Sequence, residues 1–240
     1  AAGERRGILI KGGSCLEDAR LLTAVALDKT GTITEGKPKL VEWKVWGTGD
    51  EAATQQMAAS LAGRSDHPVS KAIVQGLEVR GPEAENFKAL PGRGVEGVVN
   101  GLRLVLGNHR LIHEQGLCTP DLEAELAIHE KQGRTVTLLA DESRVLALFA
   151  VADTIRETSK QAIVDLKALG VTSVMLTGDN TATAKAIAAQ AGIDDARGDL
   201  LPEAKLDAIK EMQKRYGATG MTGDGINDAP ALAQADIGFA

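Results

Sequence analysis

The sequence contains few aromatic residues, few cysteines and no long apolar stretch. Phe, Trp and Tyr together make up 2% of the 240 residues, so a core has to be built from Ala, Val, Leu and Ile. The cysteines, Cys15 and Cys118, are far apart and match no ligand spacing, which favours free buried thiols in a reducing compartment over a disulfide. No stretch approaches the roughly 20 apolar residues of a transmembrane helix, and no signal peptide is visible.

Basic charge is also scarce. The 27 Lys and Arg residues are outnumbered by 33 Asp and Glu, which gives a net charge of −6. This balance argues against nucleic acid as a partner, because phosphate contacts need clustered cations. The 43% hydrophobic and 25% charged residues are typical of a soluble globular protein with one large or two modest domains. Both ends are abrupt, and the first residue is not Met, so we expect a piece of a longer protein.

Three short apolar runs are each followed by an aspartate. They are residues 23–27 before Asp28, residues 172–176 before Thr177-Gly178-Asp179, and residues 218–222 before Gly223-Asp224. Helical periodicity between them, at 158–169, 181–191 and 203–212, predicts alternating βαβ units and a parallel sheet. Ligands of such sheets bind at the carboxyl ends of the strands, where all three aspartates are expected to lie.

The middle of the chain has a different pattern. Residues 51–61 and 68–79 are expected to be helices, and Asn100-Gly101 between alternating apolar runs predicts a hairpin over 94–106. A second hairpin is expected at 135–140 and 145–151. The sequence therefore predicts an α/β fold in which an α+β domain, residues 38–150, is inserted into the parallel-sheet domain, residues 1–37 and 151–240. The inserted domain should have an antiparallel sheet with helices on one face.

The predicted strand ends carry groups suited to phosphoryl transfer. The carboxylate of Asp28 can attack the terminal phosphate of ATP and form an acyl phosphate. The supporting groups are Lys205 as a cation, Thr177 and the Gly178 amide as hydrogen-bond donors, and Asp224 and Asp228 as oxygen ligands of Mg²⁺. Caps of helices and turns are the alternative role for aspartates, and for Asp179 alone that alternative stays open.

The segment Asp28-Lys29-Thr30-Gly31-Thr32 resembles the phosphorylation motif of P-type ATPases. Residues 177–179 and 223–228 resemble two further motifs of that family, in the same order. The resemblance implies a haloacid dehalogenase-like phosphorylation domain that uses ATP and Mg²⁺. It implies that Asp28, the Thr30 carbonyl and Asp224 hold the metal ion, and that the phosphate is positioned by Lys29, Thr177, Lys205 and Asn227. Related phosphatases have a second Asp where Thr30 stands, so here the acyl phosphate should persist.

The inserted domain resembles the nucleotide-binding domain of the heavy-metal-transporting branch of the same family. The matching residues are His67-Pro68, the glycines Gly92 and Gly94, and Gly107-Asn108. Glycines let the backbone approach a base or ribose closely, and an imidazole face can stack on adenine. The chain departs from the family pattern in having Ala62 and Ala204 where relatives commonly carry acidic residues.

The residues 67–70 look more like those of zinc, cadmium and lead exporters than of copper exporters. The resemblance thus implies a soluble catalytic fragment at the cytoplasmic face of the cell membrane. Its partners would be ATP and the membrane and actuator domains of the same pump, with the transported metal ion bound elsewhere in the full protein. The alternatives are a copper exporter, a free-standing phosphatase of the same fold, and a nucleotide-binding module without catalysis. His109 and His113, four residues apart, could in principle ligate a metal, but we expect them to be surface residues, because no third ligand stands near them.

Overall fold

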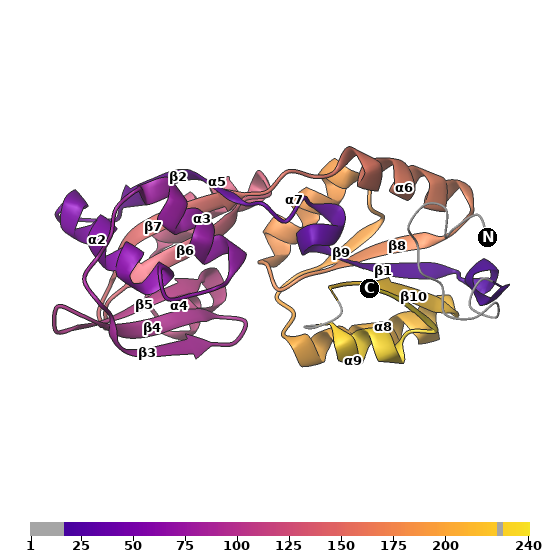
Figure 1. Ribbon diagram of the computed structural model, residues 1–240. Coiled ribbons are helices and arrows are strands. Elements are labelled where there is room, and N and C mark those ends of the chain that lie inside the picture. Colours follow the sequence, from indigo (N-terminus) through magenta and orange to yellow (C-terminus); the bar gives the residue numbers. More distant parts are fainter. Residues whose placement is uncertain (1–16, 225–227) are drawn as a thin grey trace.

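The computed structural model describes residues 17–224 and 228–240, and it contains two sheets of opposite character that form the two halves of the molecule in Figure 1. One sheet is parallel and the other antiparallel. The chain leaves the parallel sheet after its first strand, builds the whole antiparallel sheet, and then returns. The predicted fold class, a parallel-sheet α/β unit interrupted by an antiparallel α+β unit, is confirmed.

The parallel sheet has β1 at its centre, in the order β11-β10-β1-β8-β9. Its strands are β1 (Ala24–Asp28), β8 (Thr172–Leu176), β9 (Asp195–Arg197), β10 (Thr219–Thr222) and β11 (Ile237–Phe239). Helices α6 (Glu157–Ala168) and α7 (Thr181–Ala191) cover one face, and α8 (Pro202–Tyr216) and α9 (Ala229–Gln234) cover the other (Figure 1). The apolar run of β1 serves both layers, because Val25 and Leu27 pack on one side and Ala24 and Ala26 on the other.

The antiparallel sheet has the order β2-β7-β6-β5-β4-β3. Its strands are β2 (Lys39–Val45), β3 (Glu85–Leu90), β4 (Gly94–Val99), β5 (Leu102–Asn108), β6 (Thr135–Ala140) and β7 (Val145–Ala152). The turn between β4 and β5 is the predicted one. Asn100 and Gly101 have φ values of 51° and 78°, as a two-residue type I′ hairpin requires.

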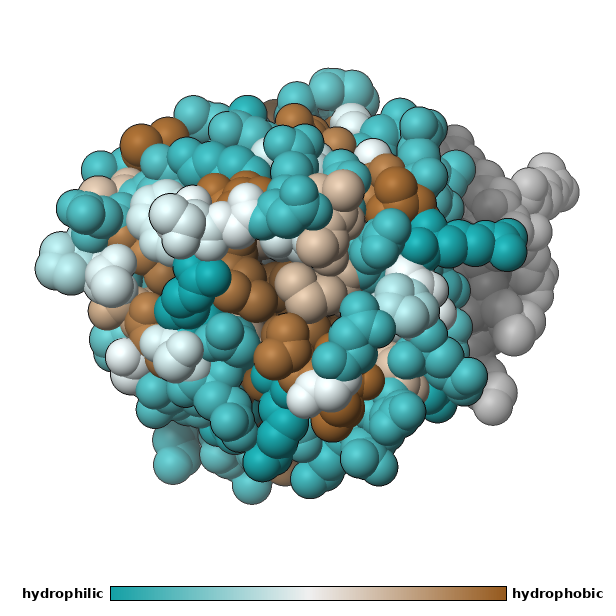
Figure 2. All heavy atoms as spheres, turned by 90° about the vertical axis from the view of Figure 1, so that its left-hand side faces the viewer, coloured by the Kyte–Doolittle hydropathy of each residue, from teal (hydrophilic) through white to brown (hydrophobic). Residues whose placement is uncertain are grey.

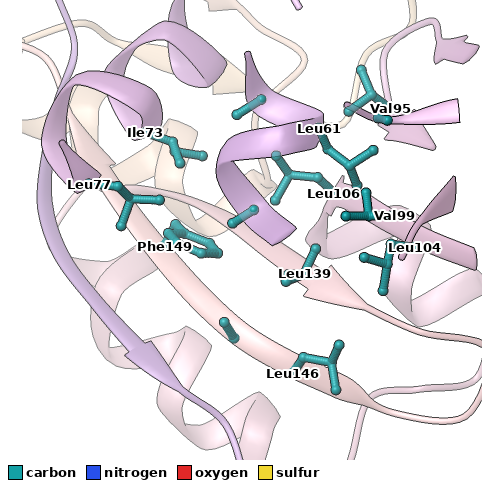
Figure 3. Close-up of a cluster of buried hydrophobic side chains, with 14 of the residues drawn as sticks. Leu61, Ile73, Leu77, Val95, Val99, Leu104, Leu106, Leu139, Leu146 and Phe149 are labelled. Atoms are coloured by element: carbon teal, nitrogen blue, oxygen red, sulfur yellow. The ribbon is translucent and has the colours of Figure 1, made fainter. Parts of the chain in front are cut away.

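Helices cover both faces of this sheet, so the expectation of one covered face was wrong. Helices α2 (Glu51–Ala62) and α3 (Pro68–Leu77) pack on one face, where Phe149 and Leu139 lie among their side chains (Figure 3). Helices α4 (His109–Glu114) and α5 (Pro120–Lys131) pack on the other face, against Leu138 and Leu148. Two covered faces explain why seven consecutive residues of β7 are buried.

The outer end of the antiparallel half is mainly hydrophilic, with a band of apolar side chains across its middle (Figure 2). Scattered apolar residues are normal on protein surfaces, and this band carries no functional conclusion. Across residues 17–224 and 228–240, no helix is both long enough and apolar enough to cross a bilayer.

Two chain segments connect the halves, and they are bonded to each other. The Gly36 and Lys37 amides donate to the carboxylate of Asp153, at 3.0 and 3.2 Å. Thr34 pairs with Ile155 in an isolated antiparallel bridge. The outgoing and returning segments therefore form one clasped connection between the sheets.

Candidate active site

The strand register brings the predicted site residues to one edge of the parallel sheet. Asp28 pairs with Leu176 of β8, and Leu27 pairs with Thr222 of β10. Thr177 and Gly223 therefore begin the loops on either side of Asp28. Because the chain continues outward from β8 on one side and returns to β10 on the other, this edge is a topological switch point, where ligands of parallel sheets bind.

Asp28 is buried and shares a lysine with a second carboxylate. Lys205 Nζ, from α8, lies 2.8 Å from Asp28 Oδ1 and 2.7 Å from Asp228 Oδ1. Burial raises the pKa of Asp28, while the Lys205 ammonium opposes that rise. Burial alone would lower the pKa of Lys205, but the two carboxylates reverse the direction and raise it. Lys205 is therefore a charged ammonium that holds two acidic groups together.

Lys29 and Asp179 form a second buried ion pair beside the first. Asp179 also accepts a hydrogen bond from the Thr135 hydroxyl at 3.2 Å, and its amide donates to Thr177 Oγ1 at 3.1 Å. The side chain of Asp179 thus faces Lys29 and the antiparallel half. Among the described contacts, the carboxylate of Asp179 caps no helix.

The segment after Asp28 turns sharply, which leaves Thr30 exposed at the site. Gly31 has a φ of 78°, and the Thr34 amide donates to the Lys29 carbonyl at 3.1 Å. The Thr34 hydroxyl also donates to that carbonyl, at 3.3 Å. This turn explains the glycine of the motif, since a side chain at that φ is strained.

The acidic residues fit a hard cation such as Mg²⁺. Asp228 Oδ2 is buried and makes no hydrogen bond to any residue that the structure describes, although buried carboxylate oxygens are normally satisfied. Asp224 and Thr30 line the same cleft as Asp28 and Asp228. Oxygen donors of this kind are the ligands that Mg²⁺ takes. Asn227, which the resemblance also implicates, lies outside the described residues.

The glycines of the antiparallel half converge at the adjacent ends of β4 and β5. Gly94 pairs with Gly107, and the Asn108 side chain donates to the Gly92 carbonyl at 2.8 Å. A Cβ on Gly94 would lie 2.2 Å from the Leu106 carbonyl oxygen, so a larger residue does not fit. Gly92, Gly94, Gly107 and Asn108 therefore lie close together in one tight turn of the chain.

His67 precedes α3 and lines the cleft, where both halves of the molecule surround its ring. Its Nδ1 accepts a hydrogen bond from the Val69 amide at 3.3 Å, which caps the helix. Burial, with a smaller contribution from Lys29, lowers the pKa of His67, whereas Asp179 opposes the shift. The imidazole is therefore neutral near pH 7, as an aromatic face for a base should be.

One cleft of about 520 Å³ joins the two sets of residues. This volume is in the range of about 300–1,000 Å³ that small-molecule sites occupy. The lining contains the charged residues of the parallel half and the glycine loop of the antiparallel half. The predicted residues that line it are Asp28, Lys29, Thr30, His67, Gly92, Gly94, Gly107, Asn108, Thr177, Gly178, Asp179, Lys205, Asp224 and Asp228.

Several contacts across the cleft were missed by sequence reasoning. Arg110 Nη1 donates to the Asp199 carbonyl at 2.9 Å, and Thr183 Oγ1 donates to the Arg134 carbonyl at 2.9 Å. These bonds join α4 and the start of β6 to the α7 side of the parallel half. Backbone carbonyls have no sequence signature, so no pattern could have revealed these partners.

His109 of α4 is largely buried, contrary to the expectation of a surface residue. The side chain of His109 is only 15% exposed, and its ring lies within hydrogen-bonding distance of Glu123 and Glu130. Cys118, which is a half-buried free thiol, lies close by. Third ligands are thus near His109 in space, although His113 is exposed as expected.

A family model of haloacid dehalogenase-like hydrolases matches residues 22–236. The chain belongs to this family. A copper-exporting P-type ATPase B of Archaeoglobus fulgidus is 44% identical over 239 residues, and a probable cadmium-transporting ATPase of Alkalihalophilus pseudofirmus is 39% identical over 247 residues. Each alignment covers 98% of this chain and 34% of the relative. The chain thus spans about a third of the length of these curated relatives.

Solved structures give the same placement. The catalytic domain of the CPx-ATPase CopB-B has a TM-score of 0.75 and 26% identity, with 98% of this chain and 83% of that chain covered. A zinc-transporting PIB-type ATPase in its E2.Pi state has a TM-score of 0.60 and 40% identity, with 99% and 39% covered. Together with the motifs, these similarities place the chain in the heavy-metal branch of the P-type ATPases.

Proposed function

We propose that this chain is the ATP-binding catalytic part of a heavy-metal cation pump and that Asp28 becomes phosphorylated. One observation carries the proposal. The buried carboxylate of Asp28 lies at the end of the central strand, 2.8 Å from Lys205, in a cleft whose opposite wall is the glycine loop. That arrangement supplies a nucleophile, a fixed cation and a nucleotide-sized space in one place.

In the proposed reaction, a carboxylate oxygen of Asp28 attacks the terminal phosphorus of ATP. The bond between that phosphorus and the bridging oxygen breaks, ADP leaves with the electron pair, and an aspartyl phosphate remains. Lys205 and Lys29 offset the negative charge of the transferred group, and Thr177 and the Gly178 amide donate hydrogen bonds to its oxygens. Asp28, the Thr30 carbonyl, Asp224 and Asp228 would hold Mg²⁺, which supplies further charge neutralisation when bound. Asn227 completes the proposed set that positions the phosphate.

The division of labour follows the two sheets. Residues 1–37 and 151–240 form the proposed phosphorylation domain, and residues 38–150 form the proposed nucleotide-binding domain. His67 stacks on the base, and Gly92, Gly94, Gly107 and Asn108 let the backbone approach the nucleotide. The tight pairing of Gly94 with Gly107 supports this assignment.

The proposed cargo is zinc, cadmium or lead, on the basis of residues 67–70 alone. Copper is the second candidate, because relatives of similar identity are named as copper exporters and as cadmium transporters. In either case, the proposed location is the cytoplasmic face of the cell membrane. The membrane and actuator domains of the same pump are the proposed partners, and the cargo is bound in the membrane part.

A phosphatase of the same fold is the competing enzyme class. Such phosphatases use a second acid two residues after the nucleophile, and here that residue is Thr30. Without that acid, nothing at this position activates water against the acyl phosphate. The proposal therefore expects a phosphate on Asp28 that is stable enough to detect.

Labelled ATP tests the proposal. Wild-type pump should incorporate label from the terminal phosphate of ATP into an acid-stable, base-labile form. Asp28→Asn should abolish this incorporation and leave ATP binding nearly unchanged. Asp207→Asn, at an exposed aspartate of α8, is the matched control and should incorporate label normally. Incorporation of base-labile label by Asp28→Asn would refute the assignment of the nucleophile.

A further inference from the structure

A mixed cluster of metal-ligating side chains lies in the antiparallel half, apart from the acidic residues around Asp28. Potential ligand atoms of His109, Cys118 and Glu123 all lie within 4.8 Å of one another. They come from the start of α4, the segment before α5, and the first turn of α5. Three different ligand types meet here because the chain folds back between two helices on the same face of the sheet.

The second nitrogen of His109 has the partner that metal-ligating histidines usually have. Its Nδ1 lies 2.6 Å from Oε1 of Glu130, a carboxylate that is 7% exposed. A carboxylate that accepts the Nδ1 proton fixes the orientation of the ring. Glu130 and Glu123 raise the pKa of His109 to about 9, so both ring nitrogens carry a proton in the metal-free chain, and the Nε2 proton leaves when a metal binds. Nε2 points to the Glu123 carboxylate, 2.9 Å away.

A fourth ligand is within reach. His113, one turn further along α4, has its Nδ1 3.4 Å from the other oxygen of Glu123. The two histidine rings lie edge to face with centroids 6.5 Å apart. Glu123 thus lies between the two imidazoles, which leaves the fourth position of a tetrahedral site to His113 or to water.

We propose that His109, Cys118 and Glu123 bind a divalent cation of the zinc and cadmium type. Nitrogen, sulfur and oxygen donors together suit a borderline-soft ion. A thiolate is a poor ligand for the hard ions Mg²⁺ and Ca²⁺. On binding, the metal–sulfur and metal–nitrogen bonds form, and the thiol proton of Cys118 and the Nε2 proton of His109 pass to solvent. This inference concerns a site in the antiparallel half and does not depend on ATP chemistry.

A second cluster in the same half provides an internal contrast. Glu42, Glu125 and His129 also lie within ligand distance of one another. In that cluster, however, Lys44 Nζ is 2.6 Å from Glu125 and Arg134 Nη1 is 3.2 Å from Glu42. Protein cations already neutralise those carboxylates, so the cluster has little attraction left for a metal. Around His109, by contrast, the described side-chain partners of Glu123 and Glu130 are imidazoles and a thiol, which can give up a proton to make room for a metal, whereas Lys44 and Arg134 cannot be replaced in this way.

The site also adjoins the parallel half. Asn180 Nδ2 lies 3.3 Å from Nδ1 of His109, and Asn180 caps α7 immediately after the Thr177-Gly178-Asp179 loop. A metal ion on Nε2 would therefore fix the His109 ring, which belongs to the antiparallel half and contacts Asn180 of the parallel half.

Cadmium titration of the chain tests the proposal. In a Cys15→Ser background, Cd²⁺ should produce the ultraviolet charge-transfer absorption of a Cd–S bond, saturating at about one ion per chain. Cys118→Ser in that background should abolish the band. His109→Gln should raise the Kd for Zn²⁺ at least about tenfold, and Glu130→Gln about tenfold through the ring orientation. Glu142→Gln, at an exposed carboxylate, is the control and should leave the Kd unchanged.

The outcome does not depend on every variant folding. Far-ultraviolet circular dichroism reports whether each variant is folded. The ¹¹³Cd NMR shift of the Cys15→Ser chain reports its ligands directly, because one sulfur shifts the resonance away from the region of all-oxygen and nitrogen sites. A sulfur-type resonance supports the site. A Cys15→Ser chain that shows neither the charge-transfer band nor a sulfur-type resonance overturns the proposal.

Discussion

The two walls of the cleft differ in how they are built. On the parallel side, charged groups are buried and paired, with Lys205 between Asp28 and Asp228 and with Lys29 against Asp179. On the antiparallel side, the proposed binding residues are glycines, Asn108 and the imidazole of His67, and the charged side chains of that wall, Arg93, Arg110 and Glu130, are not among them. Buried charges are strongly oriented and suit a reaction in which charge moves, whereas close backbone approach suits recognition of a flat, neutral group. The contrast teaches that chemistry and binding should be separable by mutation.

The largest expected effect comes from removing the cation of the parallel wall. Lys205→Met leaves Asp28 and Asp228 buried without their shared ammonium, and the rate of phosphorylation should fall by about 10²–10³-fold. The variant should also lose about 3–5 kcal/mol of folding stability, because unpaired buried charges are costly. Rapid-quench phosphorylation and urea denaturation measure the two effects.

The comparison predicts that ATP affinity changes far less than the rate in this variant. Lys210→Met, at an exposed lysine of the same helix, is the matched control and should behave as wild type. If Lys205→Met loses ATP affinity as strongly as it loses rate, the two walls do not divide the work as described.

A smaller effect is expected from the antiparallel wall. His67→Ala removes an aromatic face, which should weaken ATP binding by about 0.5–1.5 kcal/mol. The phosphorylation rate at saturating ATP should stay close to that of wild type. Titration calorimetry measures the affinity, and His113→Ala, outside the lining of the cleft, is the control. An unchanged Kd in His67→Ala would show that the base does not stack on this ring.

The smallest effect concerns pH. Burial lowers the pKa of His67 from its ordinary value of 6.5, so the unfolded chain takes up this proton before the folded chain does. Protonation of His67 leaves the free energy of unfolding unchanged well above pH 6.5 and lowers it as the pH falls below that value. His67→Asn keeps a side-chain acceptor for the cap of α3 but does not titrate. Melting temperatures between about pH 7.5 and pH 5.5 should therefore fall less steeply for this variant than for wild type. If the melting temperatures of wild type and His67→Asn fell equally with pH, the pKa of His67 would not be lowered in the folded chain.

Sequence patterns predicted the buried elements well and the edge elements poorly. Strands β1 and β8 are buried on both faces, so their apolar runs are distinctive, and α7 spans the predicted residues 181–191. The edge strands β2 and β3 were missed because most of their residues are exposed or only partly buried, which leaves no clear alternation. Helix α5 was missed although Thr119 and Pro120 form a recognisable start, with the threonine hydroxyl accepting from Leu122.

The same contrast holds for the candidate site. Asp28, Lys205 and Asp228 could be brought together from the sequence because strand ends and motif order limit where they lie. The neighbours of His109 could not, since Cys118 and Glu123 approach it only because α4 and α5 lie on the same face of the antiparallel sheet. Contacts to backbone, such as that of Arg110 with Asp199, are invisible in a pattern of side chains.

The clasped connection between the halves has a mechanical consequence. Two independent tethers would let the antiparallel half twist as well as tilt. Here the carboxylate of Asp153 binds the amides of Gly36 and Lys37, and the Glu35 amide donates to the Thr154 carbonyl at 2.9 Å. The two connecting segments therefore act as a single hinge, and we expect the antiparallel half to rotate about one axis relative to the parallel half. If the glycine loop holds the nucleotide as proposed, this one rotation would bring it toward Asp28.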